Sequence, residues 1–124
     1  MTQANTQGYV VSTGATVAIR QVVRLVSGTL EPVTAATQIP IGVAEDSGEQ
    51  NQRVAVRLDG RLLALINASG GAIAAGTQLM GAAGGTLVPF VSGGSNIAIA
   101  KLLEPVVNEF SGSALVLFYQ SPSS

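Results

Sequence analysis

The side chains that most often carry enzyme chemistry are scarce in this chain of 124 residues, which has no His and no Cys. That composition excludes Ser-His-Asp and Cys-His catalysis, disulfides, and the usual zinc, haem and iron–sulfur sites. Lys101 is the only lysine, and it lies in the alternating segment Ile97-Ala-Ile99-Ala-Lys101 with no nucleophile motif beside it. A Ser–Lys dyad is therefore not indicated.

The seven carboxylates form no catalytic or metal-binding pattern. A glycosidase needs two carboxyl groups across a sugar ring, in a pocket usually lined by aromatic side chains. This chain has no Trp and only five Phe and Tyr residues, and nothing in the sequence links Glu104 to Glu109. The one acidic run, Glu45-Asp46-Ser-Gly48-Glu49, lacks the alternating ligands of a calcium loop, so we interpret it as a solvated loop.

One glycine motif has the spacing of a phosphate-binding loop. Gly71-Ala-Ile-Ala-Ala-Gly76-Thr77 lacks the Lys that must follow the second glycine to reach the phosphates. A tight turn before a strand is the simpler interpretation. We expect no enzyme activity, no catalytic residues, no cofactor and no metal.

The charge of the chain excludes further partners. Six basic and seven acidic residues give a net charge of −1, so no basic face is available for nucleic acid. No apolar run approaches the roughly 20 residues that cross a bilayer, and residues 1–8 are polar without a basic region, so we expect neither a membrane segment nor a signal peptide. Charged residues make up only 10% of the chain, which predicts that other subunits cover much of its surface.

The elements that must position any site are strands. Val, Ile and Thr are plentiful, and Gly and Pro interrupt the chain often. The pattern predicts ten strands, near residues 8–12, 16–20, 22–26, 38–44, 53–58, 61–66, 78–81, 86–90, 96–103 and 114–120. The helix candidates are residues 71–75 and residues 102–110, the second interrupted by Pro105.

These elements predict an all-β fold. We expect a small single-domain β-barrel or β-roll/sandwich of about 8–10 short strands with a mobile N-terminal arm. The predicted boundaries are an arm at residues 1–8, a β domain at residues 9–120 and a flexible C-terminal tail at residues 121–124.

Asp59-Gly60 is a strong signal for a two-residue hairpin turn. The pairing it implies puts Val54, Val56, Leu58, Leu63 and Leu65 on one face, which we assign to the core. The opposite face is too apolar to be fully wet. It is covered either by a second layer of the same domain or by another subunit with arginine contacts at its rim. The candidate subunit-interface residues on that face are Arg53, Arg57, Leu62 and Ile66.

A series of short segments from Ile41 onward follows a recognisable order. They are Ile41-Gly-Val-Ala44, Val54-Ala-Val56, Gly60-Arg61, Gly70-Gly-Ala-Ile73-Ala-Ala-Gly76-Thr-Gln-Leu79, Ile97-Ala-Ile99-Ala-Lys-Leu-Leu-Glu104 and, after Gly112, Ala114-Leu-Val-Leu-Phe118. Over the stretch that these segments span, about two thirds of its length, the chain resembles the capsid decoration proteins of tailed bacteriophages, also called cement or head-stabilising proteins. The chain has Thr77 at the position after the glycine where that family often has an Asp.

The resemblance implies a compact β-barrel or β-roll on the outside of an icosahedral head, made in the host cytoplasm. Such proteins commonly form homotrimers that bridge neighbouring capsomers, with an N-terminal arm on the capsid. The expected partners are the major capsid protein and other copies of the chain. By position, the candidate capsid contacts are Thr2, Gln3, Ala4, Asn5, Thr6, Gln7 and Tyr9.

Two alternatives stay open. One is another structural virion component, such as a tail or head-completion subunit. The other is a carbohydrate- or receptor-binding module, which would need an exposed aromatic platform.

Overall fold

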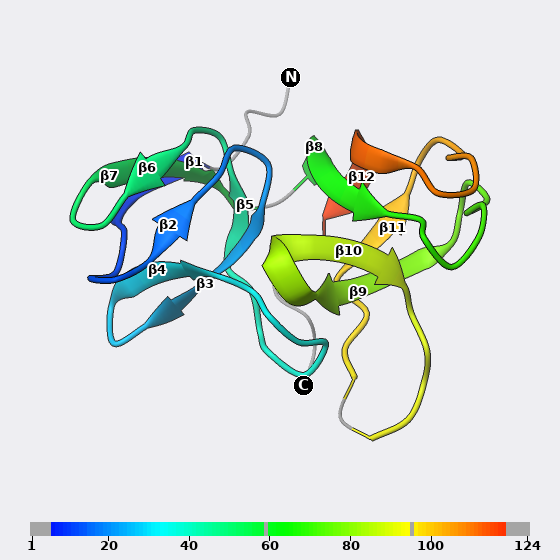
Figure 1. The fold of residues 1–124 in the computed structure, drawn as a ribbon, viewed down its shortest axis with the longest axis horizontal. Helices are drawn as coiled ribbons and strands as arrows, with labels where there is room; N and C mark the ends of the chain where they lie inside the picture. Colours follow the sequence, from blue (N-terminus) through cyan, green and yellow to red (C-terminus); the bar gives the residue numbers. More distant parts are fainter. Residues whose placement is uncertain (1–5, 59, 95, 119–124) are drawn as a thin grey trace.

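The computed structural model describes residues 6–58, 60–94 and 96–118, and it consists of two β units that lie side by side (Figure 1). The first unit holds β1 to β7, and the second holds β8 to β12 and one short 3-10 turn, η1. The bounds are β1 (Thr6–Val10), β2 (Thr16–Val17), β3 (Val22–Val26), β4 (Thr29–Pro32), β5 (Gly42–Ala44), β6 (Gly48–Glu49), β7 (Arg53–Arg57), β8 (Gly60–Asn67), β9 (Gln78–Ala82), η1 (Ala83–Gly85), β10 (Thr86–Pro89), β11 (Ala100–Leu102) and β12 (Ser111–Phe118).

The first unit is a five-stranded sheet in the order β1-β7-β5-β3-β4, with the small β2-β6 pair beside it. Every pairing inside these two sheets is antiparallel. The second unit is a closed barrel in the order β10-β8-β12-β11-β9. Its longest pairing is the antiparallel ladder of β8 with β12, from Gly60↔Phe118 to Asn67↔Ser111. The predicted all-β fold with a small barrel is confirmed.

Two hydrophobic cores share strands β3 and β5. Val22 and Val43 belong to the barrel core, together with Phe118 and Leu79, whereas their neighbours Val23 and Ala44 belong to the core of the first unit. Successive side chains of a strand point to opposite faces, so these two strands are buried on both sides. Because the barrel core contains side chains of the first unit, the two units form one domain.

Backbone hydrogen bonds also join the units. The Leu65 amide donates to the Arg20 carbonyl at 3.0 Å, and the Gly85 amide donates to the Val33 carbonyl at 2.8 Å. A third bond runs from the Ile97 amide to the Ala36 carbonyl at 3.1 Å. These bonds join the first unit to the barrel at three separate points.

The predicted strands are found, with shifts at their ends. The segment 22–26 coincides with β3, whereas the predicted strands at 38–44 and 96–103 are reduced to the short strands β5 and β11. Strands β4 and β6 are missed by the sequence prediction. The two helix candidates are wrong: Ile73 and Val106, one from each segment, pair with each other in an isolated antiparallel bridge. That pairing gives both segments backbone partners that a helix of one or two turns would not supply.

The hairpin prediction at Asp59-Gly60 is wrong. Strand β7 already pairs with β1 on one edge and β5 on the other, so β8 crosses to the barrel and pairs with β12. A two-residue hairpin turn of this kind is found instead at Ser27-Gly28, between β3 and β4, with φ values of 51° and 85°. Two positive φ angles are what a type I′ turn requires.

The crossover also reverses the predicted faces of β8. Leu62 and Ile66 point into the barrel core, at 6% and 1% exposed, whereas Leu63 lies outside at 41% exposed. Leu65 is half-buried. Val54 and Val56 are buried as predicted, in the core of the first unit.

At the N-terminus, β1 begins at Thr6 and pairs with β7 from Thr6↔Arg57 to Val10↔Arg53. Three residues of the segment that we assigned to an arm, Thr6, Gln7 and Gly8, are therefore part of a sheet. The rest of the predicted arm, residues 1–5, and the predicted tail at residues 121–124 lie outside the described residues.

The close packing of β5 against β7 predicts a strict requirement for glycine at position 42. A Cβ atom at Gly42 would lie 2.2 Å from the Arg57 carbonyl oxygen and 2.8 Å from a methyl group of Val56. We expect Gly42→Ala to lower the free energy of unfolding by about 1–3 kcal/mol, as other overpacking substitutions do. Chemical denaturation of the purified chain measures this change.

The matched control is Gly70→Ala, where a Cβ atom would meet nothing within 4 Å. It should change the free energy of unfolding by no more than about 0.5 kcal/mol. Equal effects at the two positions would contradict the packing described for β5.

Candidate functional site

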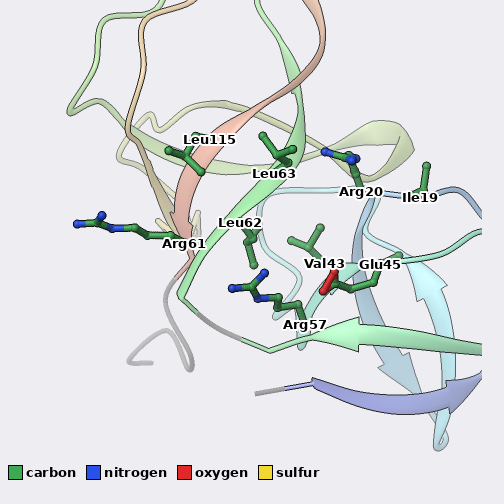
Figure 2. Close-up of a pocket in the computed structure, with 10 residues that line it drawn as sticks. Ile19, Arg20, Val43, Glu45, Arg57, Arg61, Leu62, Leu63 and Leu115 are labelled. Atoms are coloured by element: carbon green, nitrogen blue, oxygen red, sulfur yellow. The ribbon is translucent and has the colours of Figure 1, made fainter. Parts of the chain in front are cut away.

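A cleft with a volume of about 300 Å³ lies where the sheet meets the barrel. Figure 2 shows its walls, which come from the β3–β5–β7 side of the first unit and from β8 and β12 of the barrel. Its lining residues are Ile19, Arg20, Val43, Ala44, Glu45, Arg57, Arg61, Leu62, Leu63 and Leu115. The cleft therefore combines apolar side chains with a cluster of charges.

Positive charge predominates in this cleft. Arg20, Arg57 and Arg61 are three of the five arginines of the chain, and Glu45 is the only acidic side chain among the lining residues. In the described part of the chain, the single ion pair joins Arg24 to Glu31 at 3.7 Å, outside the cleft. The cleft thus holds an excess of cationic groups that are not neutralised by ion pairs among the described residues.

Arg57 is the most constrained of these groups. Its side chain is half-buried, and its Nε atom is buried without a hydrogen-bond partner among the described residues. A buried donor without an acceptor costs about 1–3 kcal/mol, so native chains rarely keep one without a reason. In Figure 2, Leu62 lies beside the Arg57 guanidinium, Glu45 reaches toward the Arg57 side chain, and Arg61 extends outward from the rim.

Arg20 holds the two walls at a fixed distance. Its amide donates to the Ala44 carbonyl at 2.8 Å, and its carbonyl accepts the bond from the Leu65 amide. Its φ of 72° lies in the left-handed region, which a non-glycine residue adopts only when its surroundings impose it. This strained residue is one of the points at which the backbone of the first unit bonds to the barrel.

Only part of the predicted subunit-interface set lies together. Arg57 and Leu62 line the cleft, but Leu62 is almost fully buried and Ile66 is inside the barrel. Arg53 is exposed elsewhere on β7 and donates to the Gly8 carbonyl at 3.3 Å. The single apolar face that would carry all four residues does not exist, because β7 and β8 are not neighbours in one sheet.

The predicted capsid-contact residues fall into two groups. Thr6, Gln7 and Tyr9 lie on β1, where the Tyr9 hydroxyl donates to Gln7 Oε1 at 3.0 Å. Thr2, Gln3, Ala4 and Asn5 lie outside the described residues.

The sequence analysis missed Arg20, Arg61 and Leu63 as cleft residues. The sequence feature that could have indicated the cleft is the pair Arg57 and Arg61, which lie on either side of the crossover at Asp59-Gly60. A hairpin there would have put Arg57 opposite Leu62 and kept both arginines on one small sheet. Only the fold shows that the two arginines lie on different units.

The other chemical candidates gain no support. Among the described residues, no three His, Cys, Asp or Glu side chains gather closely enough to hold a metal ion. Likewise, none of the described segments forms a helix long and apolar enough to span a membrane. Between Gly71 and Thr77 the chain runs as a loop before β9, and within it Ile73 forms the isolated bridge to Val106.

A search of solved structures finds a match to this arrangement over nearly the whole chain. The fold is similar to that of a phage head fiber base. The matching structure is "the crystal structure of head fiber gp8.5 N base in bacteriophage phi29". The match has a TM-score of 0.67 and covers 98% of this chain and 99% of the other, at 14% sequence identity.

Identity at this level shows a shared fold, which includes both β units because the match covers both chains almost completely. No protein-family model matches the chain, and no curated protein matches it in sequence.

The unpartnered Nε of Arg57 predicts an unusual response to mutation. We expect Arg57→Met to leave the free energy of unfolding of the isolated chain within about 1 kcal/mol of the wild type, or to raise it, because it removes a buried donor without an acceptor. As a control on the same strand, Val56→Ala removes two buried methyl groups and should cost about 2 kcal/mol. If Arg57→Met lowers the free energy of unfolding as much as the control does, the Arg57 side chain stabilises the fold and the prediction is wrong.

Proposed function

We propose that this chain is a structural protein of a tailed-phage virion, which binds the outer surface of the assembled head and stabilises it. The observation that carries the proposal is the fold match, over the full length of both chains, to the base of a phage head fiber. The sequence pattern from Ile41 onward, which resembles that of head decoration proteins, supports the same class of protein independently of the fold.

The character of the candidate site agrees with a binding role. Arginine together with exposed apolar side chains is typical of the surfaces that proteins use to bind one another. Ile19 and Leu63, both in the lining of the cleft, are 44% and 41% exposed. Burial of these exposed leucine and isoleucine side chains against another protein would remove apolar surface from water, and the three arginines beside them could pair with its polar groups.

The proposed mechanism is stabilisation by preferential binding. A protein that binds only the assembled shell shifts the equilibrium toward that shell at every occupied site. We propose that each copy, as part of a homotrimer, bridges neighbouring capsomers of the major capsid protein. Several weak contacts made together then act as one strong contact, because the second and third contacts form at high effective concentration.

The N-terminal segment remains a proposed capsid contact. Residues 1–5 precede β1, whose first residues, Thr6 and Gln7, are exposed. Contact between this segment and the shell would add to the area that each copy buries.

A second structural role is favoured by one observation. The similar structure is the base of a fiber, so this chain could serve as the base of a fiber at a limited number of head positions. A carbohydrate-binding role is less favoured. Within the described residues, each aromatic side chain is buried or half-buried, so these residues supply no exposed aromatic platform.

Copy number separates these roles. In purified virions of the source phage, we expect about one copy of this chain per copy of the major capsid protein, because a trimer at every three-fold and local three-fold position matches the capsid subunits one to one. Quantitative mass spectrometry with isotope-labelled peptides from both proteins measures the ratio.

A ratio many times lower would favour the fiber base or a tail or vertex position. Complete absence of the chain from virions would contradict a structural role in the virion. The lysate of the same infection serves as the control, since it shows that the chain is expressed and detectable.

A further inference from the structure

Strand β8 has a free backbone edge that opens into the cleft. On one side β8 pairs with β12 along its whole length. On the other side it pairs with β10 at a single position, Ile66↔Leu87, near its C-terminal end. The part of β8 from Gly60 to Ala64 therefore has no strand partner on that side among the described residues.

The register shows which backbone groups face the cleft. The Leu65 amide bonds to Arg20, away from β12, and backbone groups two residues apart on a strand point to the same side. The amides and carbonyls of Leu63 and Arg61 therefore also point away from β12. The hydrogen bonds of Leu115, which lies opposite Leu63 on β12, support this orientation. The Leu115 amide donates to Glu104, and the Leu115 carbonyl accepts from the Leu103 amide. Leu63 and Leu115 are therefore not a hydrogen-bonded pair.

Among the described residues, no hydrogen bond is found from the amide of Arg61 or of Leu63 to a backbone or side-chain acceptor. Both residues also line the cleft, opposite the half-buried Arg57 with its unpartnered Nε. An unpaired strand edge is a template for an additional strand, and a guanidinium group is a matching partner for a carboxylate. The two features lie in one cleft.

We propose that this cleft binds an extended, acidic segment of the capsid protein as an added strand on β8. Main-chain hydrogen bonds to Arg61 and Leu63 hold the segment, and a carboxylate of the segment binds Arg57. An apolar side chain next to that carboxylate packs on Leu63 and Ile19. The identity of the partner as the capsid protein rests on the proposed function, whereas the chemistry of the bound segment rests on the cleft alone.

Charge favours a different protein over a second copy of this chain as the occupant. Two copies joined by a two-fold axis at this cleft would bring two sets of three arginines together, and like charges at an interface are unfavourable. An acidic segment neutralises these groups instead. Strand addition also gives affinity without demanding a large apolar surface, because the backbone supplies the hydrogen bonds.

The first test separates the backbone of Leu63 from its side chain. Leu63→Pro removes the amide that faces the cleft, and proline is tolerated on a strand edge whose N–H is not part of the ladder. Leu63→Ala keeps the amide. In co-sedimentation of the full chain with heads stripped of it, we expect both variants to weaken binding, since both lose the apolar contact of the Leu63 side chain. Leu63→Pro should weaken it at least tenfold more than Leu63→Ala, because only Leu63→Pro also loses the amide.

The second test concerns the charge. Arg57→Gln should weaken binding at least tenfold. Arg53→Gln removes the same charge from the same strand outside the cleft and should weaken it less than twofold. An equal loss in the two variants would overturn the assignment of the carboxylate to Arg57.

Hydrogen exchange keeps the inference testable if Leu63→Pro does not fold. The probe is a soluble peptide of alternating valine and glutamate, with a lysine-for-glutamate peptide as the control. We expect the valine–glutamate peptide to protect the amides of Arg61 and Leu63 in the wild-type chain, and the lysine peptide to leave them unprotected. Protection by neither peptide, or equally by both, would overturn the inference.

The outcomes distinguish the two proposals. If the wild-type chain binds heads and both cleft variants bind equally well, the cleft inference is wrong and the head-binding function stands. If the wild-type chain does not bind heads, the proposed function is wrong, and the peptide measurement alone decides what the cleft binds. A dimer or trimer that forms through the cleft, seen as dissociation of the oligomer by Leu63→Pro, would identify a second copy as the occupant and overturn the inference.

Discussion

The structure depends on two strands that are buried on both faces. Strands β3 and β5 place Val22 and Val43 in the barrel core and Val23 and Ala44 in the core of the first unit. Neither unit can move relative to the other without exposing one of these side chains to water, at a cost of about 1.5–3 kcal/mol for each valine. The positive φ of Arg20 and the walls of the cleft lie where this shared wall meets the barrel.

The strand content could be predicted from the sequence because it rests on local signals. β-branched residues and frequent Gly and Pro breaks located most of the strands, and the run Val22–Val26 was placed correctly. The strand order could not be predicted in this way, since it depends on contacts between segments far apart in the chain. Two signals of similar appearance, Ser27-Gly28 and Asp59-Gly60, have different roles because β7 has no free edge to offer β8.

The same limit explains the errors in the candidate site. A hairpin at Asp59-Gly60 would carry the alternation of β7 into β8 across one turn, and this prediction divides the apolar residues of β8 between the wrong faces. With two cores, the side chains of Leu62 and Ile66 belong inside the barrel and that of Leu63 belongs outside. The sequence did single out Arg57, which lines the cleft, and its contact with another subunit stays a prediction. It could not group Arg57 with Arg20, which is distant in sequence and reaches the cleft through the shared wall.

In the proposed role, the cleft binds its partner through charge, backbone hydrogen bonds and apolar contacts. Its charge, its free strand edge and its exposed apolar side chains are held in place by a backbone that both cores fix, so little conformational entropy is lost when a partner binds. The central claim of this account is that the chain lies on the outside of a phage head with the cleft against the shell. An electron cryo-microscopy map of the intact heads tests it most directly. The account predicts two-lobed density on the outer surface where capsomers meet, with an extended capsid segment beside β8. Density for the chain only at the tail, or on the head with the cleft facing solvent, would contradict it.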